Sequence, residues 1–356
     1  PVTEQGRFGG RTVPIGWCQE MRDQAALVRE ATKWDYELRF PEQVPELVDR
    51  ALAIATSVPR GPVYVALPRE VLCEPCPSGG LDAPPSMLPP ETEPGPRAIA
   101  RLADLIATAT NPVIFAQHGA GNGFDALARL AERWAIPVCQ YWALQLALPT
   151  DHPMAAPDTP GALLESADLV ICLDTLAPWM PAAHTPRAEA CVVQISQDPL
   201  AIRSPIRNFR ADLALTCDPG AAILALEAAL ETREPGAGVA RRRRLIEQTN
   251  RAARAKILAA AAPDDTPAMT KAQIALALSE ALKGRDATVL SELGCPMAPM
   301  DLSHARAWYQ EPHAGGLGWS FPAAMGMQLA HPDRLIVATM GDGSYMFCNP
   351  VVCHQI

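Results

Sequence analysis

The sequence has no long uninterrupted apolar run. A proline, a glycine or a charged residue breaks every apolar segment before it reaches the roughly 18 residues that a membrane span requires. Positive charge is not in excess either, since 30 Lys and Arg stand against 39 Asp and Glu, for a formal net charge of −9. The charge balance excludes a general attraction to nucleic acids or anionic membranes. The one basic run, 241–244, opens a helix-like stretch and is interpreted as a solvated helix face. We therefore predict a soluble protein.

A disulfide framework is also missing, although the chain has 10 cysteines. Three of them lie inside apolar segments: Cys139, Cys172 and Cys191. Such positions are typical of buried free thiols in a reducing cytoplasm. Cys73 and Cys76 form a C-x-x-C that could be half of a zinc site, but no second pair follows at suitable spacing. We predict a cytoplasmic protein without a structural zinc.

The chain ends show no targeting signal. The sequence begins at Pro1 and has neither a basic start nor an apolar signal core, and "VVCHQI" at the other end carries no stop signal. We expect this chain to be an interior part of a longer one.

The 36 prolines divide the 356 residues, and the length alone favours two or three domains. The segment 73–97 is too rich in proline to propagate a helix or a central strand, and weaker breaks lie at 231–240 and 260–270. The predicted organisation is a first domain over 1–80, a linker over 81–97, a central domain over 98–232, a helical linker over 233–265 and a third domain over 266–356.

Helical periodicity alternates with short apolar runs throughout these domains. Helices are predicted over 41–57, 98–109, 124–135, 161–167, 271–283 and 321–330, and strands over 61–67, 112–116, 137–142, 168–173, 191–196, 287–293 and 334–340. Such alternation is typical of parallel sheets covered on both faces. The predicted fold class is α/β, with three consecutive parallel-sheet layered domains.

One glycine-rich turn, "GAGNG", lies between a predicted strand and a predicted helix. Its glycines, Gly119, Gly121 and Gly123, have the spacing G-x-G-x-G, whereas a dinucleotide site requires G-x-G-x-x-G. No acidic residue ends the next strand, so the usual ribose-binding partner is also missing. A tight turn without a ligand is favoured, and an NAD(P)-binding oxidoreductase stays open as an alternative.

Two further turns lie close together near the end of the chain. "GGLGW", with Gly315, Gly316 and Gly318, precedes a helix, and "GDGS", from Gly341 to Ser344, follows the next strand. Asp342 is a hard oxygen donor suited to Mg²⁺, and flanking glycines allow backbone N–H groups to approach phosphates. The pair predicts a phosphate-and-metal site.

Here the sequence resembles the thiamine diphosphate-dependent enzymes of the acetolactate synthase and benzoylformate decarboxylase type. The resemblance rests on "TKWDYELRFPEQVPELVDRALAIATSVPRGPVYVALPREVL", on the central segments "NPVIFAQHGAG", "DLVICLDT" and "VVQISQDP", and on "GGLGWSFPAAMGMQLAHPDRLIVATMGDGSYMF". It implies that the chain covers the end of a pyrimidine-binding domain, a central domain and the first part of a diphosphate-binding domain, so that the outer two domains are truncated.

The resemblance also implies roles for individual residues. Asp342 matches the Mg²⁺ ligand, and Leu317 matches the apolar residue that bends the cofactor. The other implied cofactor-binding residues are Gly294, Cys295, Gly316, Gly341, Gly343 and Ser344. His313 is a candidate for contact with substrate, with a structural histidine as the alternative. Trp308, Tyr309 and Trp319 make an aromatic substrate conceivable, with packing as the alternative.

Departures from the family pattern bear on activity. The family's second metal ligand, an asparagine, lies past the next helix, and Asn349 is too close to Asp342 to serve. The catalytic residue that activates the cofactor, a glutamate, lies ahead of anything corresponding to Thr32. We therefore expect this chain to be inactive by itself. A segment typical of FAD-binding members is replaced by "MAAPDTPGALLESADLV", so a flavin-free relative is favoured.

The resemblance implies a thiamine diphosphate- and Mg²⁺-dependent decarboxylase or carboligase that acts on a 2-oxo acid. Its active site would form between two chains, so a homodimer or homotetramer is expected. A non-catalytic homologue is the second alternative.

Overall fold

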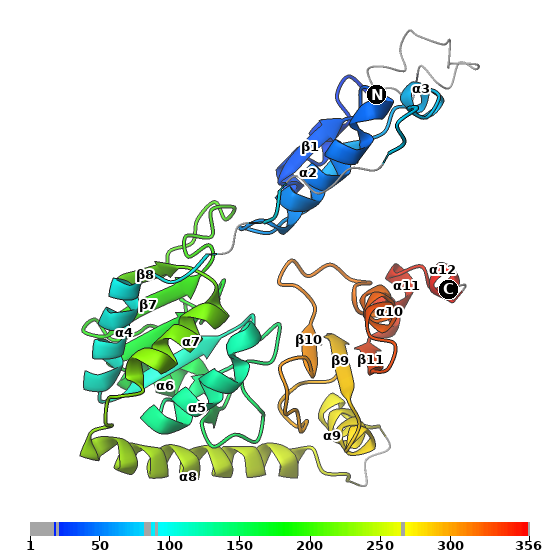
Figure 1. Ribbon diagram of the computed structural model, residues 1–356. Helices are drawn as coiled ribbons and strands as arrows, with labels where there is room; N and C mark the ends of the chain where they lie inside the picture. Colours follow the sequence, from blue (N-terminus) through cyan, green and yellow to red (C-terminus); the bar gives the residue numbers. More distant parts are fainter. Residues whose placement is uncertain (1–17, 19–20, 82–86, 90–91, 265–267, 355–356) are drawn as a thin grey trace. The chain divides into compact units, whose positions relative to one another are not determined.

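A computed structural model describes residues 18, 21–81, 87–89, 92–264 and 268–354. The chain divides into two compact units, Pro1–Glu91 and Thr92–Ile356 (Figure 1). Each unit is described by itself.

The first unit is a small α/β layer. Its strands β1 (Trp34–Glu37) and β2 (Val63–Ala66) are parallel, with Trp34 opposite Val63. Helix α2 (Val44–Thr56) connects them, and α3 (Arg69–Leu72) follows β2. Short 3₁₀ helices lie at Ala25–Leu27, Arg29–Ala31 and Pro41–Gln43. The core is formed by Leu38, Leu47 and Val71, which burial keeps away from water.

The second unit contains a central six-stranded parallel sheet with the order β5-β4-β3-β6-β7-β8. Its strands are β3 (Pro112–Ala116), β4 (Val138–Cys139), β5 (Ala155–Ala156), β6 (Leu169–Leu173), β7 (Cys191–Ser196) and β8 (Leu213–Thr216). Every residue of β3 and β6 is buried. Continuous apolar strands of this kind belong to sheets covered on both faces.

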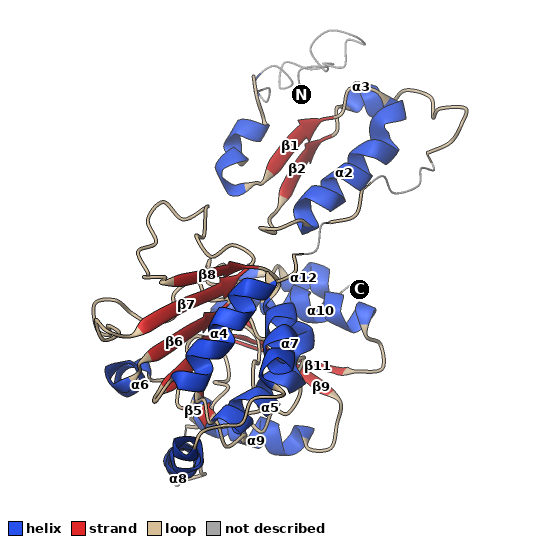
Figure 2. Cartoon of the chain, turned by 60° about the vertical axis from the view of Figure 1, so that its left-hand side comes forward, coloured by secondary structure: helices blue, strands red, loops and turns tan. Residues whose placement is uncertain are grey.

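Helices cover both faces of this sheet. On one face lie α4 (Pro96–Thr108), α5 (Phe124–Trp134) and α7 (Pro219–Leu230), which pack on alternate residues of β3 such as Ile114 (Figure 2). On the other face α6 (Pro160–Ser166) places Leu164 in a cluster with Phe115 and Trp179. Because successive side chains of β3 point to opposite faces of the sheet, this strand contributes to two separate cores.

Helix α8 (Ala237–Ala260) runs from the central sheet to the last part of the chain (Figure 1). The prediction of a solvated face over 241–244 is wrong for Arg242. Its guanidinium donates to the carbonyls of Ala109, Thr110, Trp134 and Ala135, at distances of 2.7–3.1 Å. The carbonyls at a helix end have no partner within the helix, and Arg242 satisfies them for α4 and α5.

A three-stranded parallel sheet with the order β10-β9-β11 forms the rest of the second unit. Its strands are β9 (Ala287–Glu292), β10 (Trp308–Gln310) and β11 (Leu335–Met340), and its helices are α9 (Lys271–Leu282), α10 (Ser320–Ala330), α11 (Asp342–Phe347) and α12 (Pro350–Cys353). Thr150 joins this part to the central sheet, since its hydroxyl donates to the Met300 carbonyl at 2.7 Å. The three parallel sheets confirm the predicted fold class.

Some predicted bounds are wrong. The strand expected over 137–142 contains only β4, because the Gln140 side chain accepts N–H groups of Ala147 and Leu148 and closes a loop. Trp142 in this loop has a φ of 50°. Strands β1, β5, β8 and β10 and helices α3, α7, α11 and α12 were not predicted. The predicted domain boundaries stay predictions, and the division observed lies between residues 91 and 92.

Candidate functional site

The carboxyl ends of β9 and β11 bring two of the predicted segments together. Gly294 and Cys295 follow β9, Gly341 and Asp342 follow β11, and all four line one cavity of about 870 Å³. Gly294 is required by the close approach of the two strands, because a Cβ at this position would lie 2.5–2.6 Å from Thr339. The Cys295 N–H donates to the Thr339 hydroxyl at 3.2 Å, which fixes the turn.

Asp342 begins helix α11 directly after the cavity-lining end of β11. Its Oδ1 accepts the Gly343 N–H at 2.9 Å, whereas its Oδ2 has no partner among the residues that the structure describes. Apart from adjoining parts of the chain, no atom of the described residues lies within 4 Å of where a Cβ would stand at Gly341 or Gly343. The turn therefore offers an open backbone and a free carboxylate oxygen, the kind of donor that Mg²⁺ prefers.

Glu292, at the end of β9, holds the loop before α10 through hydrogen bonds. This residue was not among the predicted site residues. It is fully buried, and its two oxygens accept the N–H groups of Gly318 at 2.6 Å and Ser320 at 2.7 Å. Burial alone would raise its pKa, but these bonds and hydroxyl hydrogen bonds from Ser344 and Ser320 outweigh that effect and hold the pKa below its usual value. Glu292 is thus an anion that joins β9 to both later turns. An acidic residue inside the apolar run "ATVLSEL" was the available signal.

The glycine-rich loop before α10 lies beside α11 rather than in the cavity. A Cβ at Gly318 would stand 2.9 Å from the backbone of Phe347 and Cys348, and the φ of Gly318 is 88°. Gly316 and Leu317 are not among the cavity-lining residues, and the Leu317 side chain is 45% exposed. Ser344 is buried, with its hydroxyl bonded to Glu292. The cofactor roles of Gly316, Leu317 and Ser344 stay predictions.

His313 lies just before that loop and connects it to the central domain. Its Nε2 lies 3.0 Å from the Trp142 carbonyl, and its ring is 6.0 Å from that of His118. Burial lowers the pKa of His313, the bond to Trp142 opposes this, and His118 lowers it further, so the result is below the usual value. A neutral ring that donates to a carbonyl is a structural role, and contact with substrate stays a prediction.

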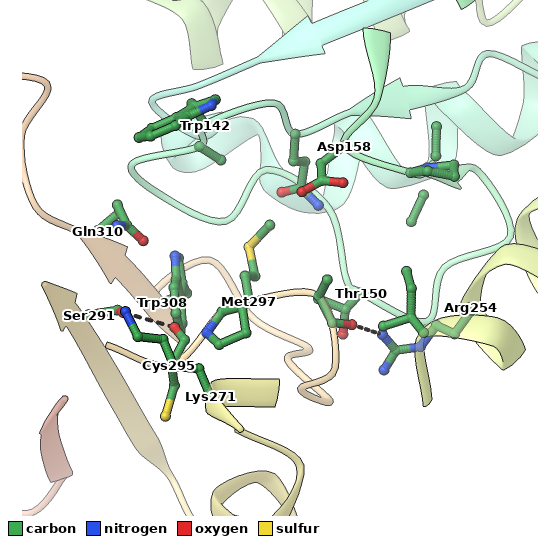
Figure 3. Close-up of a pocket in the computed structure, with 18 of the residues that line it drawn as sticks. Trp142, Thr150, Asp158, Arg254, Lys271, Ser291, Cys295, Met297, Trp308 and Gln310 are labelled. Atoms are coloured by element: carbon green, nitrogen blue, oxygen red, sulfur yellow. Dashed lines mark hydrogen bonds between the residues drawn. The ribbon is translucent and has the colours of Figure 1, made fainter. Parts of the chain in front are cut away.

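A second cavity, of about 370 Å³, lies on the other side of the turn after β9. It is bordered by the central domain, α8 and the turn itself, and Figure 3 shows Trp142 and Asp158 along one wall and Cys295 and Lys271 along another. Lys271, Leu293, Gly294 and Cys295 line both cavities. The turn after β9 is therefore accessible from two sides.

The structure also places the remaining candidate residues from the sequence. Gly123, the last glycine of the "GAGNG" turn, packs on α7, since a Cβ there would lie 2.9 Å from the Gly220 carbonyl oxygen, whereas Gly121 is exposed. Cys73 and Cys76 are exposed free thiols. Within the described ranges, no three His, Cys, Asp or Glu residues are grouped to hold a metal ion.

Two models of one family match the chain. The central domain of the thiamine pyrophosphate enzymes matches residues 99–226, and their C-terminal domain, which binds thiamine pyrophosphate, matches residues 294–354. The chain therefore belongs to the family of thiamine diphosphate-dependent enzymes, as the resemblance predicted.

Two curated relatives are similar to this chain over most of its length. Over 350 residues the chain is 30% identical to a probable 2-ketoarginine decarboxylase of Pseudomonas aeruginosa, covering 93% of this chain and 59% of that protein. It is 29% identical over 346 residues to the benzoylformate decarboxylase of the same organism, covering 90% and 60%. The chain thus spans about 60% of the length of these curated relatives.

Solved structures show the same fold. The benzoylformate decarboxylase of Polynucleobacter necessarius superposes with a TM-score of 0.68 at 22% identity, covering 88% of this chain and 58% of that one. A thiamine diphosphate-dependent 4-hydroxybenzoylformate decarboxylase of Rhodococcus jostii gives 0.66 at 25% identity, covering 91% and 61%.

No helix within the described ranges has the length and apolar character needed to cross a membrane.

Proposed function

We propose that the protein is a thiamine diphosphate- and Mg²⁺-dependent decarboxylase or carboligase that acts on a 2-oxo acid. The observation that carries this proposal is the cavity where the turns after β9 and β11 meet, with Gly294 and Cys295 facing Gly341 and Asp342. Family membership supports the cofactor, since the matched C-terminal domain is the one that binds thiamine pyrophosphate.

The residues present fit the cofactor and its metal ion. Mg²⁺ is commonly held by one or two carboxylates together with phosphate oxygens and water, so Asp342 with its free Oδ2 suffices as a first protein ligand. The open sides of Gly341 and Gly343 leave room for phosphate oxygens beside the backbone. Gly294 and Cys295 would border the same group from β9.

Thiamine diphosphate, when bound, would supply the carbanion that adds to the carbonyl of a 2-oxo acid. The chain's own contribution is positioning. Asp342 would hold the metal ion, and Glu292 holds the loop that carries Gly316 and Leu317 at the end of β9. Ile336, Ala338 and Met340 line the cavity, and such apolar surface beside a bound carboxylate would favour loss of CO₂.

The names of the relatives support the proposed substrate class. Two of them are named as decarboxylases of 2-ketoarginine and benzoylformate, both 2-oxo acids, and others are acetolactate synthases, such as the Mycobacterium leprae enzyme at 28% identity. Loss of CO₂ is the step that a decarboxylase and a carboligase share.

We propose further that no flavin takes part. The carboxyl ends of β3 and β6 form the point where the strand order of the central sheet reverses, and ligands of α/β sheets bind at such points. Here the Gln117 side chain spans this position: its amide donates to Tyr141 and Ala177 carbonyls, and its Oε1 accepts the Leu176 N–H at 2.9 Å. His118 bonds to the Asp174 carbonyl oxygen at 2.6 Å beside it.

A homodimer or homotetramer in the cytoplasm completes the proposal. Val48 and Leu52 on α2 are 62% and 64% exposed, and Met346 and Phe347 on α11 are 67% and 71% exposed. Apolar side chains exposed on helices are typical of subunit contacts. The free thiols favour a reducing compartment. Light scattering after size-exclusion chromatography measures the oligomeric state, and a monomer at micromolar concentration would contradict this part.

The test is calorimetric titration of the protein with thiamine diphosphate and Mg²⁺, comparing wild type with Asp342→Ala. Asp333→Ala, an exposed carboxylate ahead of β11, is the matched control. We expect binding by wild type and the control, and at least tenfold weaker binding by Asp342→Ala. Equal binding by all three overturns the metal assignment, and no binding by wild type favours the non-catalytic homologue. An NAD(P) titration with measurable heat would favour the oxidoreductase.

A further inference from the structure

Lys271 occupies the first position of helix α9, immediately after the residue that caps it. Thr270 accepts the Gln273 N–H at 3.2 Å, and its own N–H donates to the Gln273 side chain at 2.7 Å, so the helix start is fixed by a capping box. The partial positive charge at a helix N-terminus disfavours a cation in the first turn. Lys271 therefore stands where helix stability alone would not place it.

The Lys271 ammonium is directed away from its own helix toward the turn after β9. It donates to the Leu293 carbonyl, and its charge acts on the neighbouring Cys295 thiol, whose pKa is raised by burial and partly lowered by a Thr339 hydrogen bond and by Lys271. Leu293 has a φ of 51°, a left-handed conformation that non-glycine residues rarely adopt. An ammonium group has three donors, and the Leu293 carbonyl takes one of them.

The first cavity is lined by a cationic and an anionic side chain. Among the residues that the structure describes, Lys271 is the only cationic side chain that lines this cavity, and Asp342 is the only carboxylate. A diphosphate bears several negative charges, and one Mg²⁺ beside the Asp342 carboxylate leaves part of them uncompensated. A further cation with free donors is what such a group requires.

We propose that Lys271 is an additional binding residue for the diphosphate of the cofactor, acting from the β9 side of the cavity while Asp342 acts from the β11 side. This inference rests on the proposed function. It also accounts for a lysine at a helix start, where the helix dipole disfavours a cation.

The test compares Lys271→Gln and Lys271→Arg with wild type by calorimetry, using thiamine diphosphate with Mg²⁺ and, as a probe of the anion alone, inorganic pyrophosphate with Mg²⁺. Lys283→Gln is the matched control, because Lys283 lies at the opposite end of α9 and pairs with Glu280 on an exposed surface. Thermal unfolding by circular dichroism checks that the variants are folded.

We expect Lys271→Gln to bind both ligands about tenfold more weakly or worse, as the loss of a hydrogen bond to a charged group predicts. The affinity of wild type should fall with added NaCl more steeply than that of Lys271→Gln, because screening acts on the lost charge. Lys271→Arg should retain most of the affinity, and Lys283→Gln all of it. A purely structural role for Lys271 would leave the salt dependence unchanged.

Two results overturn the inference. The first is an affinity of Lys271→Gln for pyrophosphate equal to that of Lys283→Gln. The second is an unchanged salt dependence despite weaker binding. Failure of the proposed function is distinct, since wild type would then bind no cofactor or Asp342→Ala would bind it equally.

Discussion

Replacing Glu292 by Gln changes one atom in the group that connects β9 with the turns before α10 and at α11. The wild-type carboxylate accepts two backbone N–H groups at 2.6 and 2.7 Å. An amide keeps one acceptor oxygen and places an NH₂ group against the other N–H, so that two donors face each other. Either the Gly318 or the Ser320 N–H is then left without an acceptor in a buried position.

The expected cost follows from these contacts. A hydrogen bond to a charged group contributes about 1.5–3 kcal/mol, and an unsatisfied buried donor costs a similar amount, so the free energy of unfolding should fall by about 2–4 kcal/mol at pH 7. For a unit of this size that loss lowers the melting temperature by roughly 4–16 °C.

The pH dependence has a defined sign. The pKa of Glu292 is lower in the folded state than its usual 4.5, so its stabilising effect is fully present above about pH 4.5. It is lost as the pH falls through the lower folded-state value. The difference in stability between wild type and Glu292→Gln should therefore be largest at neutral pH and shrink in acid.

Thermal unfolding by circular dichroism between pH 3 and 8 measures this difference, and hydrogen exchange at the Gly318 and Ser320 amides reports the local loss. Glu280→Gln, on the exposed end of α9, is the control and should change stability by less than about 0.5 kcal/mol. The reasoning is refuted if Glu292→Gln melts like this control at pH 7, or if both amides exchange as slowly as in wild type.

Three further outcomes are expected. Gly220→Ala should destabilise the protein by about 1–3 kcal/mol in urea unfolding, because its Cβ would stand 2.8 Å from the backbone carbonyl oxygen of Ala120. A change below about 0.5 kcal/mol would contradict the close packing. Arg242→Met should lower the free energy of unfolding by about 2–4 kcal/mol in the same assay, because four hydrogen bonds to carbonyls are lost. The same change at exposed Arg244 should be nearly neutral, and equal effects of the two changes would refute the capping role. Burial raises the pKa of Cys172 to about 12, so at pH 8 a thiol reagent should label exposed Cys73 at once and Cys172 only after unfolding; rapid labelling of native Cys172 would be inconsistent with its burial.

Periodicity in the sequence determined most of the fold. Helices such as α5 and strands such as β6 bury faces that their apolar spacing already marks, and alternation of the two types requires parallel strands with covering helices. The exceptions have local causes. Strand β10 has only three residues, and β4 ends after two because the Gln140 side chain closes the following loop. Neither effect leaves a periodic signal.

The sequence by itself determined the family, through the local motifs "GGLGW" and "GDGS", and one turn of the candidate site, "GDGS". Only the tertiary structure decided which residues meet there. Glu292 and Lys271 act across 26 and 22 positions of sequence, on Gly318 and Leu293, and such pairs follow from the packing of loops and helices at the strand ends rather than from spacing. The same holds for Arg242. In the sequence it is part of a helical pattern, whereas in the fold its guanidinium bonds to carbonyls more than 100 positions away. Glu292 is buried, Arg242 is half-buried and Lys271 is exposed, so their roles come from the partners that the packed chain brings to each of them.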